Sequence, residues 1–512
     1  MFSRAYCVAL QGIEGCMVHV EADISDGLPG FSMVGFLSSE VKEAKERVRI
    51  SLKNAGYRFP AKKITINLSP ADLRKEGNVY DLPIAAALLA AFGYIPTEAL
   101  ENCILAGELS LDGLVKPVSG ILPMVYAATK QGIKSCLVPK ENVKEASVVE
   151  NMQVFGVDSL EEMVAVLKGE SKPEVQKMQP EDILDHVYRG EKMDFADVAG
   201  QEMIKRAVTI AAAGHHNMLM TGPPGSGKTM IAKRIPTIMP ALTFEEAMEI
   251  SKVYSVSGLL DGKKAMVVER PFRNPHHTIT TSALMGGGVR PMPGEVSLAS
   301  GGVLFLDELP EFQRSTLEVL RQPLEEKEVN LSRIYGNYRY PADFMLVAAM
   351  NPCRCGNYPD RRKCSCTPLM IKNYIGKISR PLLDRIDISA EVHPVPLSLF
   401  QKNAKRTGSA EMREQVMQAA VMQRERYEKE NIHFNGVLSS SQVQKFCIPD
   451  KTGAVFLKEV SEKWNLSARG YHRVLKVART IADMEGKEDI SEAHIREAVS
   501  YRDMDKKYME SM

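Results

Sequence analysis

The chain has 512 residues, which at roughly 150 residues per domain predicts two to four domains. Its 65 basic and 64 acidic side chains nearly cancel, which excludes a histone-like polycation and an acidic tail protein, so any nucleic-acid contact must come from a local patch. The longest apolar stretch, 82–96, is too short to span a bilayer, and no signal peptide is visible. The nine cysteines are an odd number and do not form a secreted disulfide framework, so we expect a cytoplasmic protein with no membrane partner.

Short strand and helix patterns alternate in residues 1–168, which predicts a mixed α/β domain. A helix is predicted at 38–56 because its apolar residues share one face, namely Val41, Ala44, Val48 and Leu52. Further helices are predicted at 81–92 and 120–129, and strands at 5–10, 17–20, 64–68, 103–106 and 136–139. The polar residues 169–189 are interpreted as a linker.

The second segment, 190–395, carries short apolar runs at 217–220, 303–306 and 344–350. Runs of this length are typical of strands buried on both faces, as in a parallel sheet. Each run ends in glycine or polar residues, and open α/β sheets bind ligands at the carboxyl ends of their strands. We therefore expect the chemistry of this segment at one edge of a parallel sheet.

A phosphate-binding loop is predicted directly after the first of these strands. The pattern GxxxxGK[ST] is complete in Gly222, Pro223, Pro224, Gly225, Ser226, Gly227, Lys228 and Thr229. Backbone N–H groups of such a loop surround phosphate, while Lys228 is expected to reach the β- and γ-phosphates and Thr229 to bind Mg²⁺. A chance glycine-rich turn is the alternative.

Polar residues at the ends of the other two strands complete this predicted site. Asp307 is expected to hold Mg²⁺, and Glu308 to polarise the attacking water, which favours a hydrolase over a kinase. Asn351 is expected to contact the γ-phosphate or that water, unless it only forms a turn with Pro352. For the adjacent His276 and His277, ordinary hydrogen bonds or a phosphate contact are expected rather than a metal.

Two arginines are candidates for stabilising the transferring phosphoryl group. Arg385 is preferred over Arg380 as an arginine finger acting in trans, and a structural ion pair with a nearby aspartate is the alternative. The third segment, 396–512, is predicted to be helical, with Ser467 as an N-cap. There Arg469 is the candidate to fold over the nucleotide; it shares a basic face with Arg473 and Lys476, and a solvated face is the alternative.

Two further features are independent of the nucleotide. Four thiols in two C-x-C pairs, Cys353, Cys355, Cys364 and Cys366, suit a structural Zn²⁺, although free or redox-active thiols and an iron–sulfur cluster remain open. Residues 329–341 are predicted to form a hairpin. Its Arg333, Tyr335 and Arg339 suit binding to a nucleic-acid strand, because basic groups contact phosphates and rings stack on bases. The alternative is that the tyrosines of this hairpin pack on the sheet. The glycines 286–288 with Arg290 form a second candidate loop.

Together these motifs resemble the AAA+ ATPases related to the magnesium-chelatase ATPase subunit, and nearly the whole chain is similar to the YifB/ComM-type proteins. The typical stretches are 306–312, 351–353, 382–385, 271–278 and 293–299. The resemblance implies a hexameric ring with ATP at the subunit interfaces. It assigns Asp307 and Glu308 to Walker B, Asn351 to sensor 1, Arg385 to the finger, Arg469 to sensor 2, and 197–201 to the segment near the adenine.

The N-terminal segment resembles the proteolytic domain of Lon, notably at 106–110 and 132–142. It departs from Lon where catalysis would occur. No serine is present around Asp81, and Leu122 stands in place of the catalytic lysine. Because a Ser/Lys dyad needs both groups, we expect a non-proteolytic domain used for assembly or DNA guidance.

The predicted architecture is therefore an α/β protein: a Lon-like domain, an AAA+ parallel-sheet core and a C-terminal helical lid. The resemblance implies a DNA helicase that drives branch migration during recombination and transformation, acting on single-stranded or branched DNA. Two alternatives remain open. One is a chelatase-type motor working with a tetrapyrrole-metallating partner, and the other is a scaffold that binds protein under the control of ATP.

Overall fold

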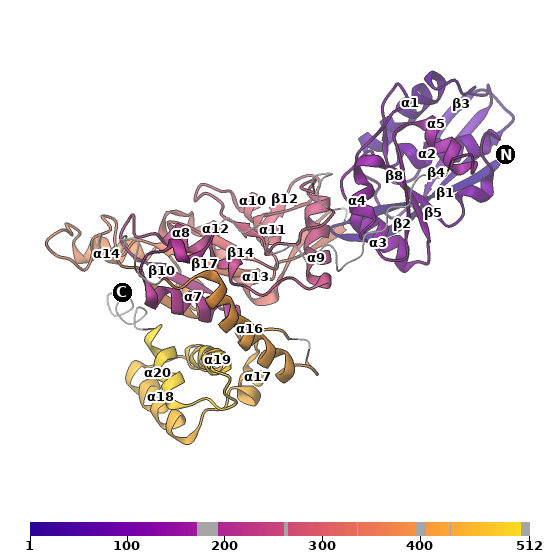
Figure 1. Cartoon of the computed structure of the whole chain (residues 1–512). Coiled ribbons are helices and arrows are strands. Elements are labelled where there is room, and N and C mark those ends of the chain that lie inside the picture. The colour runs from indigo at the N-terminus through magenta and orange to yellow at the C-terminus, as the bar shows by residue number, and fades with distance from the viewer. Residues whose placement is uncertain (172–192, 261–264, 335, 396–405, 431, 503–512) are drawn as a thin grey trace.

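The computed structural model describes residues 1–171, 193–260, 265–334, 336–395, 406–430 and 432–502. The molecule is elongated, with the N-terminal sheet at one end and the C-terminal helices beside the central sheet (Figure 1). Most of the predicted linker and the tip residue Tyr335 lie outside the described residues. No helix in these ranges is both long and apolar enough to cross a bilayer.

The N-terminal part contains a mixed seven-stranded sheet with the strand order β3-β4-β2-β1-β5-β8-β9. Strands β1 and β2 pair antiparallel with Ala5 opposite Val20, whereas β5, β8 and β9 run parallel. All five predicted strands are confirmed; β3 and β9 were not predicted. The strands are β1 (Phe2–Gln11), β2 (Glu14–Ser25), β3 (Gly30–Val34), β4 (Lys63–Ser69), β5 (Cys103–Leu105), β8 (Ser135–Pro139) and β9 (Gln153–Val157), with a small β6 (Glu108–Leu109) and β7 (Val115–Lys116) ladder.

The predicted helices of this part are also present. Helix α1 (Ser39–Asn54) begins at the N-cap Ser38, which accepts the Val41 N–H, and its predicted apolar face is buried. Helix α2 (Asp81–Ala91) is buried along its whole length. The remaining helices are α3 (Ile121–Lys130), α4 (Val143–Ala146) and α5 (Leu160–Leu167).

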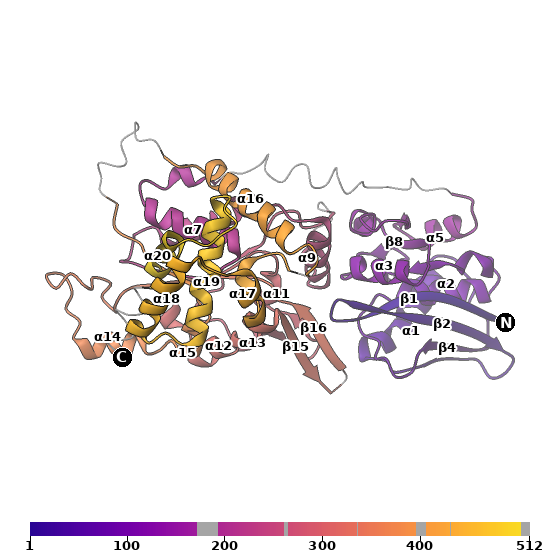
Figure 2. The same ribbon diagram turned by 90° about the horizontal axis from the view of Figure 1, so that it is seen from below.

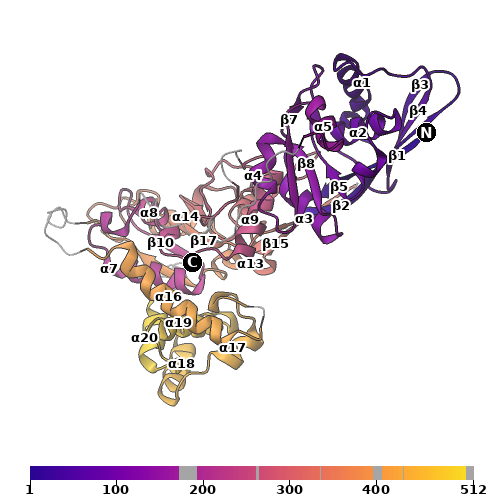
Figure 3. The same ribbon diagram turned by 45° about the vertical axis from the view of Figure 1, so that its right-hand side comes forward.

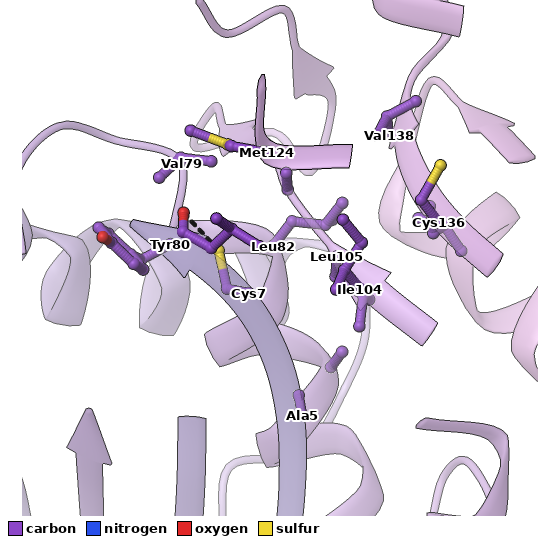
Figure 4. Packing of buried hydrophobic residues seen from close by; sticks show 14 of the residues in the cluster. Ala5, Cys7, Val79, Tyr80, Leu82, Ile104, Leu105, Met124, Cys136 and Val138 are labelled. Atoms are coloured by element: carbon purple, nitrogen blue, oxygen red, sulfur yellow. Dashed lines mark hydrogen bonds between the residues drawn. The ribbon is translucent and has the colours of Figure 1, made fainter. Parts of the chain in front are cut away.

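The positions that carry the dyad in Lon are part of the core. Asp81 is fully buried and forms an ion pair with Arg47 at 2.9 Å between Oδ2 and Nε, and it also accepts the Leu109 N–H at 3.2 Å. Leu122 is fully buried as well. Figure 4 shows the apolar packing of Cys7, Leu82 and Met124 in this part of the core. A buried carboxylate with an arginine partner is a structural ion pair.

The central sheet has five strands, all parallel, in the order β11-β14-β17-β10-β18. The three predicted strands are β10 (Met218–Thr221), β14 (Val303–Leu306) and β17 (Met345–Met350), and every residue in them is buried. The edge strands β11 (Phe272–Arg273) and β18 (Ile388–Glu391) were not predicted. The carboxyl ends of all five strands meet at one edge, as expected for a ligand site.

Short helices and two antiparallel ladders surround this sheet. The ladders are β12 (Gly286–Gly287) with β13 (Met292–Pro293), and the predicted hairpin of β15 (Glu328–Arg333) with β16 (Gly336–Pro341). The helices are α7 (Glu202–Gly214), α8 (Lys228–Ala232), α9 (Phe244–Val256), α10 (Thr281–Met285), α11 (Glu295–Leu298), α12 (Arg314–Glu318), α13 (Arg321–Glu326), α14 (Pro368–Ile375) and α15 (Arg380–Leu383).

The C-terminal part is a bundle of helices, part of which packs against α7 (Figure 3). They are α16 (Ser409–Arg426), α17 (Ser440–Phe446), α18 (Lys451–Trp464), α19 (Ala468–Met484) and α20 (Glu492–Ser500). The predicted N-cap Ser467 accepts the Gly470 N–H at 3.1 Å. Side chains of this bundle and of the central sheet belong to one apolar cluster, so the C-terminal helices are anchored to the central sheet.

The N-terminal and central parts also share a core. Leu242, Met248 and Ile250 from in and around α9 belong to the same apolar cluster as the N-terminal sheet. The Lys252 ammonium lies 3.7 Å from the Tyr126 ring centroid, and the Ser255 carbonyl accepts the Gly120 N–H at 3.1 Å. On the other side, β16 lies next to β1 (Figure 2). The hairpin of β15 and β16 is therefore in contact with the N-terminal part.

Candidate nucleotide site and nucleic-acid loops

The phosphate-binding loop joins β10 to α8 and lies against β18. A Cβ on Gly222 would lie 2.2 Å from the Val392 carbonyl oxygen, so this close approach requires glycine. Gly225 and Gly227 have φ values of +76° and +91°, and a Cβ on either would meet nothing within 4 Å. The loop therefore curves around open space, and this geometry fits a phosphate chain bound by backbone N–H groups.

Lys228 connects this loop to the tip of β17. Its ammonium donates to the carbonyls of Gly222 and Pro223 at 2.8 and 3.0 Å and to the Asn351 Oδ1 at 3.1 Å. Burial lowers the pKa of Lys228, and the nearby carboxylates of Asp307 and Glu308 partly offset this. The structure thus brings Lys228 and Asn351 together, although they are far apart in the sequence.

A pair of hard oxygen ligands lies beside the lysine. The Thr229 hydroxyl donates to the Asp307 Oδ2 at 2.6 Å, and the Glu308 N–H donates to the Asp307 Oδ1 at 2.9 Å. Mg²⁺ prefers a few protein oxygens together with phosphate oxygens and water. These two side chains fit that preference, so they would hold the ion that bridges to a bound nucleotide.

The Glu308 carboxylate has a neighbour that sequence analysis did not assign to it. Glu308 has a left-handed φ of +52°, and its side chain is 58% exposed. The His277 Nδ1 lies 3.5 Å from the Glu308 Oε2, and the centroids of the tilted His276 and His277 rings are 4.1 Å apart. The contact arises because β11 pairs with β14, and β11 is too short to recognise by its sequence pattern.

Gln201, in the segment that resembles the adenine-proximal region, also reaches the loop. Its side-chain amide donates to the Ser226 carbonyl at 3.5 Å and to the His393 carbonyl at 2.5 Å. The residue has a left-handed φ of +62° before α7. It ties the start of α7 to the phosphate loop.

The two predicted arginines lie together, but not at this nucleotide site. The Arg385 Nη2 lies 2.5 Å from the Glu325 Oε1, and the Arg469 Nη2 lies 3.7 Å from the same oxygen. Within the described residues, neither guanidinium has a hydrogen bond or ion pair to the phosphate loop, Asp307 or Glu308. The predicted catalytic set therefore divides into two groups within one chain.

The basic face of α19 is only partly solvated. The Arg469 side chain is 67% exposed, but that of Arg473 is only 7% exposed. Arg473 donates to the Ile386 carbonyl at 2.8 Å and pairs with Asp384 at 3.3 Å. The alternative of a solvated basic face is wrong for Arg473, because the turn after α15 packs onto α19.

The two candidate nucleic-acid loops lie next to each other. A Cβ on Gly287 would lie 3.2 Å from the Arg333 guanidinium. Arg333 is exposed, and Arg339, with its side chain 65% exposed, pairs with Glu328. Tyr338 and Tyr340 are buried, and Tyr340 donates to the Pro291 carbonyl at 2.8 Å. The alternative that tyrosines pack on the sheet is therefore confirmed for these two residues.

The four predicted metal-ligating thiols also come together. Cys353, Cys364 and Cys366 are buried, Cys355 is half-buried, and their sulfur atoms all lie within 4.8 Å of one another. All four belong to the loop between β17 and α14, next to Asn351. The chemistry of this donor set fits a soft, tetrahedral cation.

Comparison with known proteins decides the family. Residues 194–399 match the family described as "Magnesium chelatase, subunit ChlI", residues 20–142 match "Subunit ChlI of Mg-chelatase", and residues 406–502 match its C-terminal family. Competence protein ComM of Haemophilus influenzae is 42% identical over 98% of this chain and 97% of its own length. The chain belongs to the YifB/ComM-type magnesium-chelatase-like AAA+ family.

Other relatives agree with this family and with the fold. The uncharacterised YifB of Escherichia coli is 43% identical over 97% of this chain and 96% of its own length. A Lon protease of Trichlorobacter lovleyi is 22% identical over 33% of this chain and 23% of its own length, in agreement with a Lon-like N-terminal fold. As a YifB/ComM-type AAA+ protein the chain is an ATPase, and the family implies ATP and Mg²⁺ as cofactors.

Proposed function

We propose that this ATPase is a cytoplasmic hexameric ring motor that acts on single-stranded or branched DNA and promotes branch migration in recombination and natural transformation. In this proposal the loop 222–229 binds the phosphates, Thr229 and Asp307 hold Mg²⁺, and Glu308 polarises the attacking water. Asn351 orients that water from the tip of β17. The similarity to a competence protein supports the biological setting.

The adjacent loop tips carry the DNA part of the proposal. Val289 and Ile334 are 95% and 93% exposed, and Ile334 directly follows Arg333. An apolar residue beside a cation can insert at a base step while the cation contacts phosphate. Two such tips side by side suit a motor that contacts a nucleic-acid strand.

The position of the two arginines supports the ring. Arg385 and Arg469 meet at Glu325 instead of at the chain's own Lys228. In this proposal they serve the nucleotide of a neighbouring subunit, where they stabilise the charge of the transferring phosphoryl group. One active site then consists of residues from two subunits.

The first test is the rate of ATP turnover with and without branched DNA, with Glu308→Gln as the blank. We expect DNA to raise the rate several-fold and the mutant to lose turnover by a factor of about 100 or more. Turnover that does not respond to any DNA would overturn the motor proposal and favour a protein or tetrapyrrole partner.

The second test addresses the hairpin. We expect Arg333→Ala combined with Tyr335→Ala to bring the DNA-stimulated rate down toward the basal rate, because charge and ring are removed from the strand-contacting tip. Arg49→Ala is the matched control, because Arg49 is an exposed arginine in the N-terminal domain that pairs with nearby Glu46. Full stimulation in the double variant would remove the hairpin from the proposal.

A further inference from the structure

The four thiols between β17 and α14 have the spacing of ligands around one cation. The Cys353 Sγ lies 3.3 Å from the Cys355 Sγ and 3.8 Å from the Cys364 Sγ, and the Cys355 and Cys364 sulfurs are 3.6 Å apart. Tetrahedral Zn²⁺ with Zn–S bonds of about 2.3 Å separates its sulfurs by about 3.8 Å. A disulfide needs about 2.05 Å, so these distances fit a shared cation and not bonded pairs.

The loop that carries the thiols has little else to hold it. Its apolar cluster is separate from the larger cores and consists of the thiols with Ile371, Tyr374, Ile375 and the partly buried Tyr358. The rest of the loop is made of tight turns, such as the one in which the Gly356 N–H donates to the Cys353 carbonyl at 3.0 Å. Segments too small to form a core are commonly stabilised by a metal.

The charge of the loop suits a thiolate centre. Arg354, Arg361, Arg362 and Lys363 lie between or beside the ligands. A Zn²⁺ ion with four thiolates carries a net charge of −2, which nearby cations stabilise. Arg361 also donates to the Cys366 carbonyl at 3.4 Å.

The same loop is in contact with the phosphate-binding loop. Gly356 has a φ of +83°, and a Cβ added to it would lie 2.4 Å from the Pro224 Cδ. At its start the loop carries Asn351, whose Oδ1 accepts from Lys228 at 3.1 Å. The thiol loop therefore meets the nucleotide site at two points, one on each side of Cys353 and Cys355.

We propose that Cys353, Cys355, Cys364 and Cys366 bind one Zn²⁺ ion, and that this ion fixes the loop as a wall of the nucleotide site. Binding releases the thiol protons to solvent, and the ion then holds the loop in the conformation in which Gly356 packs on Pro224. Loss of the ion is expected to weaken nucleotide binding. The metal content is independent of the proposed DNA function, whereas the effect on affinity rests on the nucleotide site.

The metal itself is tested on the full-length protein purified under reducing conditions without chelator. We expect elemental analysis to find about one zinc per chain and Cys364→Ser with Cys366→Ser to lose it. Cys16→Ser is the matched control, because this half-buried thiol lies in the N-terminal sheet and should leave the zinc in place. No metal in the wild-type protein, iron with labile sulfide, or zinc retained in the double variant would overturn the assignment.

The coupling is tested by titration with a fluorescent ATP analogue. We expect the double cysteine variant to bind it about tenfold more weakly, and Gly356→Ala to keep its zinc but lose affinity through the clash with Pro224. Unchanged affinity in both variants would overturn the coupling. If the double variant does not fold, the nucleotide affinity of Gly356→Ala alone tests whether the thiol loop acts as a wall of the nucleotide site. If the protein binds zinc and nucleotide but its ATP turnover does not respond to DNA, the proposed motor function is overturned and this inference still holds.

Discussion

Hydrolysis is proposed to depend on the Glu308 carboxylate, and the His277 ring is its neighbour. The two side chains approach at 3.5 Å, and within the described residues no hydrogen bond or ion pair joins His277 to the phosphate loop. We therefore expect His277→Ala to lower kcat about three- to tenfold, because Glu308 loses its orientation, and to leave the KM for ATP within about twofold. Steady-state kinetics with saturating Mg²⁺ measures both constants.

His276→Ala is the matched control for this prediction. The His276 Nδ1 forms a hydrogen bond with the Thr278 hydroxyl at 2.9 Å, and the His276 ring contacts the ring of His277. The kcat of His276→Ala should fall less than that of His277→Ala. An unchanged kcat in His277→Ala would show that Glu308 is oriented without the histidine.

Among the elements, α19 combines two arginines with different tasks. Arg473 is buried against the Ile386 carbonyl and Asp384, whereas Arg469 is largely exposed. We expect Arg473→Ala to lower the free energy of unfolding by about 2–4 kcal/mol, because buried hydrogen-bond acceptors lose their partner. Thermal unfolding should show a Tm several degrees lower, and Arg469→Ala on the same helix should leave Tm unchanged. If both variants lower the Tm equally, Arg473 does not stabilise the fold more than the exposed Arg469 does.

At the scale of the whole molecule, each proposed active site needs two subunits. Arg385→Ala should lose turnover, and so should Lys228→Ala, since one removes the finger and the other the phosphate contact. Mixed rings of the two variants should recover part of the ATPase activity, because some interfaces then combine an intact Lys228 with an intact Arg385. The rate of a titrated mixture measures this recovery. No recovery in rings shown to be mixed would place Arg385 outside the active site.

Much of the fold could be predicted from local patterns. The buried strands β10, β14 and β17 are uninterrupted apolar runs, and α1 and α19 begin at serine N-caps and bury an apolar face. Short edge strands such as β11 and β18 could not be found this way, because two to four residues carry no periodic signal. The apolar core shared by α9 and the N-terminal sheet could not be predicted for a different reason, because it depends on how the two parts dock and not on a local pattern.

The sequence by itself determined the phosphate loop, Asp307, Glu308, Asn351 and the four thiols as candidates, because each belongs to a motif whose spacing is set by chemistry within a short segment. Only the tertiary structure decided which distant residues meet: His277 at Glu308, Arg385 and Arg469 at Glu325, and Gly356 at Pro224. These contacts depend on strand order and helix packing. The free energy that fixes them is distributed over the buried cores, so no short stretch of sequence contains it.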